Sequence, residues 1–348
     1  MMSEQPLEAL QSGACSFGSV GFGLDQDPPI LPKRKDGKAR IGLLVPFSGT
    51  DAIWGPSCQY GAVLAAAHVN ASGGLLGREI ELFAADAGGA PADVMPRVAD
   101  LVDRHQVDAL VGVHLSSVRV AVRDWFSARV PYVFAPQYEG GESSAGVATI
   151  GETPKEQYGD AVSWMIRHMR AKRWHLLGND YVWPRQTHKV LKKMIKDAGG
   201  EVVGENYLPL SCDEHTTTID AINKARPDIV FQSLVGADSI TFNRMFAEAG
   251  LSDRIIRLSG AIEENTLMGI SEDAAQNLYC VSGYFNSLRT EGNRSFLHEY
   301  RQAFGDTAPI QGSLSQSCYE SILALRSLAE KAQSLKPPAI NLRHSRQP

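Results

Sequence analysis

The sequence predicts an α/β protein made of two Rossmann-like lobes with parallel sheets. From residue 39 onward, short apolar runs alternate with amphipathic stretches at the spacing of βαβ units, and this alternation restarts after Pro154. A helix end, a Gly-Gly pair and a Glu-bearing apolar run occur together at 72–82 and again at 198–203. The glycines suit the left-handed residue that ends a helix. Two similar halves are therefore expected.

The first half is expected to contain four buried strands and three helices. Runs of mostly apolar residues without alternation are typical of parallel strands that are covered on both faces. Strands are predicted at 41–45, 80–84, 109–113 and 132–135, and helices at 60–69, 92–104 and 116–128. Ser116 stands where it can cap the third of these helices.

The second half repeats the pattern and is followed by two more helices. Strands are predicted at 174–177, 201–207, 229–233 and 279–281, and helices at 158–169, 184–197, 217–224, 240–249, 295–304 and 315–331. We expect an N-terminal lobe over 39–151 and 282–332, a C-terminal lobe over 152–281, a disordered tail over 1–38 and a C-terminal tail over 333–348.

Composition excludes several classes of protein. The 348 residues are 43% hydrophobic and 21% charged, which is ordinary for a globular protein. A net charge of -5 lacks the excess of basic residues that is typical of proteins that bind nucleic acid directly. No apolar run is long enough to span a membrane. Five scattered cysteines without a Cys-x-x-Cys motif predict neither a disulfide framework nor a metal site.

The first 30 residues lack the features of a secretory signal. They contain Glu4 and Glu8, no Lys or Arg, and no sustained apolar stretch. The sequence therefore predicts a cytoplasmic protein. A periplasmic location is the alternative, if an export signal has been lost or the start codon is misplaced.

No motif for catalysis is found, so we expect a binding protein rather than an enzyme. The chain has no Gly-x-Ser-x-Gly, no Walker A sequence, no His-Glu-x-x-His and no Gly-x-Gly-x-x-Gly after the first strand. No cofactor is predicted. His188 and Lys192 share one helix face, which is expected to be a solvated surface rather than a base. An enzyme of Rossmann type is the disfavoured alternative.

Polar loops follow the carboxyl ends of several predicted strands, where α/β proteins bind ligands. The candidate binding residues are His114, Ser116, Ser117, Tyr138, Asp180, Tyr181, Trp183, Gly236, Ala237 and Glu263. The Ser116 hydroxyl and nearby N–H groups could receive a carbonyl or carboxylate oxygen, and Tyr138, Tyr181 and Trp183 could sandwich a small flat ligand.

Each candidate also has a purely structural interpretation. The serine could be a simple helix cap, and each aromatic side chain could pack in the core. Asp180 and Glu263 could accept N–H groups from a ligand or only cap the helices that follow them. His114 could be a packing residue or a ligand contact.

The chain resembles type I periplasmic binding proteins of the branched-chain amino acid, urea and short-chain amide group. The resemblance covers roughly residues 39–332, and within the group it is most similar to the cytoplasmic amide sensor that negatively regulates an aliphatic amidase operon. The motifs are Gly42-Leu43-Leu44-Val45 with Tyr60-Gly61-Ala62, Leu110-Val111-Gly112 with Ser116, Tyr138-Glu139-Gly140, Asp180-Tyr181-Val182-Trp183-Pro184-Arg185, and Tyr284-Phe285.

This resemblance implies two lobes joined by three hinge crossings, with a ligand trapped in the cleft when the lobes close. In the amide sensor, residues at the positions of Ser116, Tyr138 and Tyr181 line the pocket. His114 and Trp183 stand where that sensor has tyrosines, so the ligand can differ. Family members continue after the last predicted helix into a segment that returns to the second lobe. We therefore expect either that this chain is truncated or that its C-terminal tail replaces that segment.

Two hypotheses follow from the resemblance. The first is a cytoplasmic sensor of a small amide or urea-like molecule, whose closure regulates a protein partner such as an RNA-binding antiterminator. The second is a substrate-binding protein that delivers amides, urea or branched-chain amino acids to an ABC importer. The oligomeric state is left open, with a homo-oligomer as one candidate.

Overall fold

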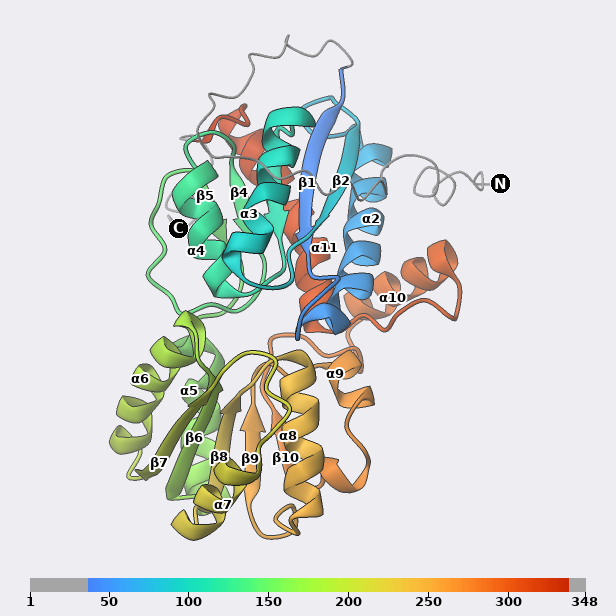
Figure 1. The fold of residues 1–348 in the computed structure, drawn as a ribbon. Helices are drawn as coiled ribbons and strands as arrows, with labels where there is room; N and C mark the ends of the chain where they lie inside the picture. Colours follow the sequence, from blue (N-terminus) through green and yellow to red (C-terminus); the bar gives the residue numbers. More distant parts are fainter. Residues whose placement is uncertain (1–36, 338–348) are drawn as a thin grey trace.

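The computed structural model describes residues 37–337, which form two lobes drawn one above the other in Figure 1. Each lobe contains a five-stranded parallel sheet. The strand order is β2-β1-β3-β4-β5 in the N-terminal lobe and β10-β9-β8-β6-β7 in the C-terminal lobe. The predicted fold class is confirmed. The tail predicted at 1–38 lies outside the described residues except for its last two, and the tail at 333–348 except for its first five.

The N-terminal lobe is built around β1, whose residues point alternately to two apolar layers. Leu43 packs with Cys58 and Ile322 on one face of the sheet, and Leu44 packs with Val94 and Val118 on the other. The strands are β1 (Ala39–Val45), β2 (Ile80–Asp86), β3 (Ala109–Gly112), β4 (Tyr132–Phe134) and β5 (Val147–Thr149). Its helical segments are η1 (Ala52–Trp54), α2 (Gly55–Ala71), α3 (Pro91–Ala99), η2 (Asp100–Arg104) and α4 (Ser116–Phe126).

The C-terminal lobe begins at α5, where Thr153 and Glu156 form a reciprocal capping box. Its strands are β6 (Arg173–Asn179), β7 (Glu201–Leu208), β8 (Ile229–Ser233), β9 (Ile256–Ser259) and β10 (Leu278–Cys280). Its helical segments are α5 (Pro154–His168), α6 (Val182–Asp197), α7 (Thr216–Ala225), α8 (Gly236–Glu248), α9 (Glu264–Met268) and η3 (Asp273–Ala275). Trp174 and Phe231 are fully buried at its centre.

After β10 the chain returns to the N-terminal lobe, where α10 (Glu291–Phe304) and α11 (Ser313–Ala332) pack against α2. Figure 1 shows α11 beside the blue strands and helix of that lobe. Gly61 lets α2 and α11 approach closely, because a Cβ atom there would lie 2.6 Å from the Ser315 carbonyl oxygen. The Tyr60 ring meets the Phe304 ring with centroids 4.7 Å apart. Segments far apart in the sequence thus form one lobe.

Several local predictions need correction. Strands β5 and β9 are not among those predicted, and the helix predicted at 92–104 is an α-helix followed by a π-helical turn. Ser116 is the first residue of α4 rather than its cap, because Leu115 occupies the N-cap position. Tyr181 likewise precedes α6 in place of Asp180. In residues 37–337, no helix is both long enough and apolar enough to cross a membrane.

The prediction that His188 lies on a solvated helix face is wrong. His188 is fully buried, and its Nε2 atom lies 2.9 Å from the Ser233 hydroxyl while Nδ1 lies 3.4 Å from a Glu205 carboxylate oxygen. These are the residue types of a catalytic triad, but Ser233 is also fully buried, so a substrate cannot reach its hydroxyl. The three residues tie α6 to β7 and β8.

Acidification should destabilise the fold through His188. Burial lowers the pKa of His188 from 6.5 to about 4. The unfolded chain therefore binds more protons between these values, and the stability present above about pH 6.5 is lost as the pH falls toward 4. We expect a loss of about 1–3 kcal/mol in the free energy of unfolding, measured by urea titration followed by circular dichroism.

His188→Gln should reduce this dependence of the unfolding free energy on pH. The exposed residue His168 provides a matched control, since His168→Gln should leave the dependence unchanged. Equal pH profiles for wild type and His188→Gln would contradict the assignment.

Candidate functional site

A small cavity of about 20 Å³ lies between the two lobes. It is lined by Trp54, His114, Leu115, Ser116, Pro136, Gln137, Tyr181, Trp183, Val235 and Leu314. This volume is about the space of one water molecule. A larger solute therefore requires the lobes or the lining side chains to move apart before it can enter.

Ser116 presents hydrogen-bond donors to the cavity from the N-terminal lobe. It is the first residue of α4, and its side chain makes no cap to the helix. In residues 37–337, no hydrogen bond engages the Ser116 hydroxyl. The first N–H groups of an α-helix have no partner within the helix, and they carry the positive end of its dipole. This corner suits a ligand oxygen.

His114 lines the cavity beside Ser116, but both of its ring nitrogens are already engaged. Nδ1 lies 3.1 Å from the Leu115 carbonyl oxygen, so it donates a proton there, and Nε2 lies 3.0 Å from the Tyr132 hydroxyl. Burial lowers the pKa of His114 to about 4, so the ring is neutral at pH 7. It contributes an uncharged aromatic wall rather than a charge or a base.

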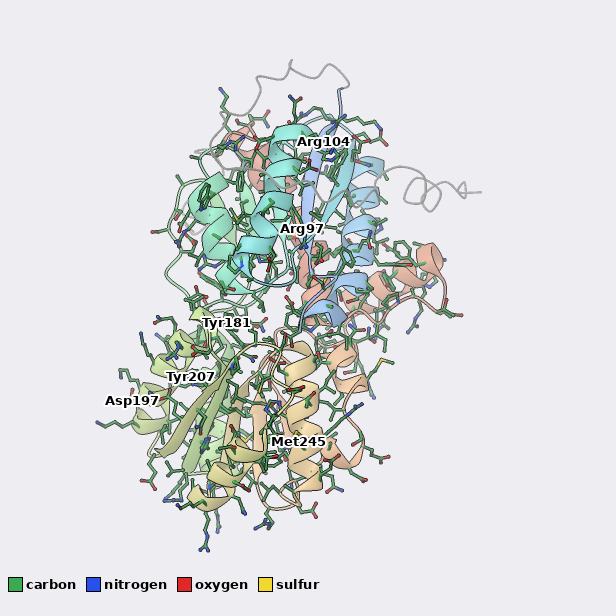
Figure 2. The ribbon with its side chains drawn as sticks, in the orientation of Figure 1. Arg97, Arg104, Tyr181, Asp197, Tyr207 and Met245 are labelled. Carbon is green, nitrogen blue, oxygen red and sulfur yellow. The ribbon has the colours of Figure 1, made fainter. Side chains whose placement is uncertain are left out.

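Tyr181 and Trp183 form the opposite wall at the start of α6. Their ring centroids lie 6.3 Å apart with planes inclined by 37°. Figure 2 shows Tyr181 at the level where the two lobes meet. Burial raises the pKa of Tyr181 well above its usual value, so its hydroxyl stays protonated and can donate or accept. Together with Ser116 and His114, four of the predicted binding residues line one cavity.

Sequence reasoning missed other lining residues. Trp54 lies in η1, directly after the polar loop that follows β1, and its indole N–H donates to the Thr266 hydroxyl at 3.3 Å. Gln137 donates from Nε2 to the Gly260 carbonyl across the lobes at 3.1 Å. The polar loop before Trp54 and the position of Gln137 after β4 were available as signals. Nothing in the local sequence pointed to Val235 or Leu314.

Six of the ten predicted residues are not among those that line the cavity, and Ser117, Tyr138 and Asp180 are the first three. Tyr138 packs beneath Arg119, whose guanidinium carbon lies 5.7 Å from the ring centroid. Asp180 is exposed and pairs with Arg185 at 2.5 Å, and this hydrogen bond lowers the pKa of the Asp180 carboxyl group. Ser117 follows Ser116 along α4 and is half-buried.

Arg119, which packs on the Tyr138 ring, also forms a buried ion-pair cluster. Its buried guanidinium group pairs with Glu139 at 2.5 Å and with Glu142, and so holds the loop after β4 against α4. A more open groove of about 360 Å³ lies here, between this loop, α4 and the first turns of α6. Arg123 and Lys189 are among the residues that line it. None of the described residues that line it is among those that line the smaller cavity.

Gly236 and Ala237 join the lobes rather than line the cavity. The Ala237 N–H donates to the Thr50 carbonyl oxygen at 2.8 Å, and the Asp238 N–H donates to the Thr50 hydroxyl at 3.2 Å. Gly236 has a φ of +49°, and a Cβ atom there would lie only 1.8 Å from the Thr50 carbonyl oxygen. We call this contact between Thr50 and residues 235–238 the Thr50 contact.

Glu263 also lies at the junction of the lobes. Its carboxylate accepts from the Thr266 N–H at 3.3 Å as the cap of α9 and from Asn265 at 3.0 Å. Gly312, which precedes α11, leaves room for it, since a Cβ atom there would lie 1.6 Å from a Glu263 oxygen. Burial raises the pKa of Glu263 to about 7. The capping interpretation accounts for this placement.

The cavity between two α/β lobes can be compared with known proteins. Residues 38–343 match the family model described as periplasmic binding protein. The chain belongs to this family. Among curated relatives, it is 23% identical over 299 residues to Leu/Ile/Val-binding protein homolog 7 of Brucella suis, covering 79% of the chain and 73% of the relative. Homolog 3 of Brucella melitensis is 20% identical over 252 residues, covering 68% of each protein.

Solved structures of similar proteins show the same fold. One is the branched-chain amino acid transporter substrate-binding protein of Streptococcus pneumoniae in complex with isoleucine, with a TM-score of 0.77, 19% identity and coverage of 88% of this chain and 87% of that one. Another is a solute-binding protein of an ABC transporter from R. palustris in complex with benzoate, with a TM-score of 0.72, 20% identity and coverage of 85% and 81%. At this level of identity, the two structures show that the chain shares their fold.

Gly236→Ala should favour an open arrangement of this periplasmic binding protein. The added methyl group cannot fit against the Thr50 carbonyl oxygen, so the lobes must separate. Small-angle X-ray scattering should show a larger radius of gyration than for wild type. The left-handed backbone adds about 1–2 kcal/mol of destabilisation.

Gly199→Ala is the matched control. Gly199 has a φ of +89° and open space around it, so its substitution imposes backbone strain without a clash between lobes. It should lower the melting temperature but leave the radius of gyration unchanged. A Gly236→Ala variant as compact as wild type would refute the role of the Thr50 contact.

Proposed function

We propose that this protein is the substrate-binding component of an ABC importer for a small uncharged solute of the amide or urea type. The observation that carries the proposal is the composition of the interlobe cavity. Among residues 37–337, none of those that line it is a Lys, Arg, Asp or Glu, and His114 is neutral. The cavity combines aromatic walls with a few polar groups, which is typical of sites for small molecules.

The lack of lining charges favours an uncharged ligand. Burial of an ammonium or carboxylate group is costly unless a charged or well hydrogen-bonded partner receives it. An amino acid brings one group of each kind, and the lining residues offer no carboxylate for its ammonium group. A carbonyl oxygen, in contrast, could accept from the Ser116 hydroxyl and the N-terminal turn of α4. The Gln137 carboxamide oxygen and the Tyr181 hydroxyl could accept the ligand's N–H groups.

The walls and the size of the cavity favour a small, flat molecule. Tyr181 and Trp183 present aromatic rings on one side, and Trp54 and His114 present rings on the others. Amides and urea are planar and can stack on such rings. Since the closed cavity has a volume of only about 20 Å³, the lobes should open to admit the solute and close around it.

The names of the relatives favour transport over regulation. The curated relatives are named as binding proteins for leucine, isoleucine and valine, and the structural neighbours as substrate-binding proteins of transporters. The expectation of an amide sensor with an antiterminator partner, and of a cytoplasmic location, gains no support from these names. The binding chemistry of the sensor would be the same, so location and partner distinguish the two functions.

Cell fractionation separates these alternatives. We expect the native protein in the periplasmic or membrane-associated fraction of its own cells. Recovery only with the cytoplasmic marker proteins, together with an antiterminator that co-purifies, would replace the importer by the sensor.

A thermal-shift screen tests the ligand class. Acetamide, propionamide and urea should raise the melting temperature, because a ligand at 100 times its Kd stabilises the folded state by about 2.7 kcal/mol. For a chain of this length, this corresponds to a shift of roughly 5 °C. Isoleucine and benzoate should give no shift at equal concentration. A shift with isoleucine alone would contradict the proposal of an uncharged solute.

Tyr181→Ala should abolish the shift while leaving the unliganded melting temperature nearly unchanged, since Tyr181 lies at the lobe junction and outside the centres of the sheets. Trp125→Ala is the control, because Trp125 lies on α4 with 62% of its surface exposed and is not among the lining residues. This variant should keep the full shift. Loss of the shift in both variants would indicate a general effect on folding rather than on the site.

A further inference from the structure

The Asp51 carboxylate is the least compensated charged group at the junction of the lobes. Asp51 is fully buried, and neither carboxylate oxygen has a hydrogen-bond partner in residues 37–337 beyond a weak contact with its own N–H. None of the ion pairs in the same part of the chain includes it. An isolated carboxylate out of water is strongly disfavoured unless it binds a proton.

The C-terminal lobe completes the burial of Asp51. The preceding residue, Thr50, donates from its hydroxyl to the Val235 carbonyl at 3.3 Å and accepts the Ala237 N–H at its own carbonyl. A Cβ atom on Gly236 would lie 3.1 Å from the Asp51 Cα atom, so the first turn of α8 covers this loop. Separation of the lobes would remove this cover and admit water to the carboxylate.

The charged groups that face Asp51 from neighbouring elements are mainly acidic. Asp86 at the end of β2 receives the N–H groups of Phe47 and Gly88 and pairs with Arg97. Asp238 in α8 accepts from Asn179 at 2.6 Å and from the Ser211 N–H at 3.0 Å, and His215 lies beyond it. Tyr181 faces the loop from α6 and stays protonated.

The carboxylates of Asp86 and Asp238 differ from that of Asp51 because each has hydrogen-bond partners within its own lobe. The partners of Asp86 belong to the N-terminal lobe, and Asn179 and Ser211 belong to the C-terminal lobe with Asp238. Opening leaves those hydrogen bonds in place, so the pKa of Asp86 should change less than that of Asp51. Asp238 also interacts with the Thr50 hydroxyl of the opposite lobe and is buried, so its titration would act in the same direction as that of Asp51. Burial, together with the charges of Asp86 and Asp238, raises the pKa of Asp51 from 3.8 to about 7.

We propose that closure of the lobes takes up a proton on Asp51, so that acid favours the closed, solute-holding form. This deepens the proposed function, since it makes solute binding depend on pH. Below about pH 4 the carboxyl group is protonated in both forms and closure carries no penalty. As the pH rises through the interval from about 4 to 7, the open form ionises first, and the closed form is disfavoured about tenfold per pH unit. Above about pH 7 both forms are ionised and the penalty is constant.

The test compares wild type with Asp51→Asn, a near-isosteric change that removes the titration. The Kd for acetamide is measured by calorimetry at pH 5, 6, 7 and 8. Between pH 5 and 7 the wild-type Kd should rise by up to about 100-fold, whereas the Kd of Asp51→Asn should stay low and change less than tenfold. Equal slopes for the two proteins would overturn the proposal.

Three further variants sharpen this comparison. Asp220→Asn replaces an exposed carboxylate in α7 and should keep the wild-type slope. Glu263→Gln reports the share of a second buried carboxylate at the junction, and Asp238→Asn that of a third, since the titration of either would act in the same direction. If Glu263→Gln or Asp238→Asn removes the whole slope and Asp51→Asn removes none, the proton is taken up by that other carboxylate and the assignment to Asp51 fails.

Scattering without solute separates this inference from the proposed function. The unliganded wild type should be more compact at pH 5 than at pH 8, Asp51→Asn should be compact at both, and Gly236→Ala should be open at both. If no solute of the screen binds at any pH, the proposed function fails, and these profiles alone decide the inference. Wild-type and Asp51→Asn profiles that coincide at every pH would overturn it.

Discussion

Thr50 meets the first turn of α8 through its hydroxyl and its carbonyl group, and the closed arrangement of the protein depends on this contact. The N-terminus of a helix offers free N–H groups, so a single residue of the opposite lobe can satisfy two of them. Only glycine at position 236 allows the backbones to approach so closely. The same approach narrows the cavity and buries Asp51, so in the proposed function closure, solute capture and burial of a carboxylate are parts of one movement.

The two walls of the cavity are constructed by the same rule in each lobe. A strand ends, a polar loop turns, and a helix begins with its free N–H groups near the cleft, as α4 and α6 do. Charged side chains near the cavity form ion pairs with one another: Arg119 pairs with Glu139 and Glu142, and Asp180 pairs with Arg185. The described lining residues are therefore uncharged, and as the proposed site they would select a solute by hydrogen bonding and shape.

The sequence was a good guide to the elements and a partial guide to the site. Apolar runs predicted most of the strands because residues such as Leu43 and Leu44 must be buried on both faces of a parallel sheet. The contact of Tyr138 with Arg119 could not be predicted, because Arg119 lies 19 positions earlier in the chain. Trp54 and Val235 reach the cavity only through the packing of loops from both lobes. Local sequence patterns carry no information on such long-range contacts.

The packing of α11 against α2 has a consequence for the order in which the protein can form. The C-terminal lobe consists of one continuous segment of the chain, from α5 to β10, and can fold as soon as that segment has left the ribosome. The N-terminal lobe is synthesised first but lacks the helix that covers α2 until α11 emerges about 240 residues later. Until then, an apolar face of α2 around Ala62 and Ala65 stays open to water or to a chaperone. The half of the protein that is made first is therefore the half that is finished last.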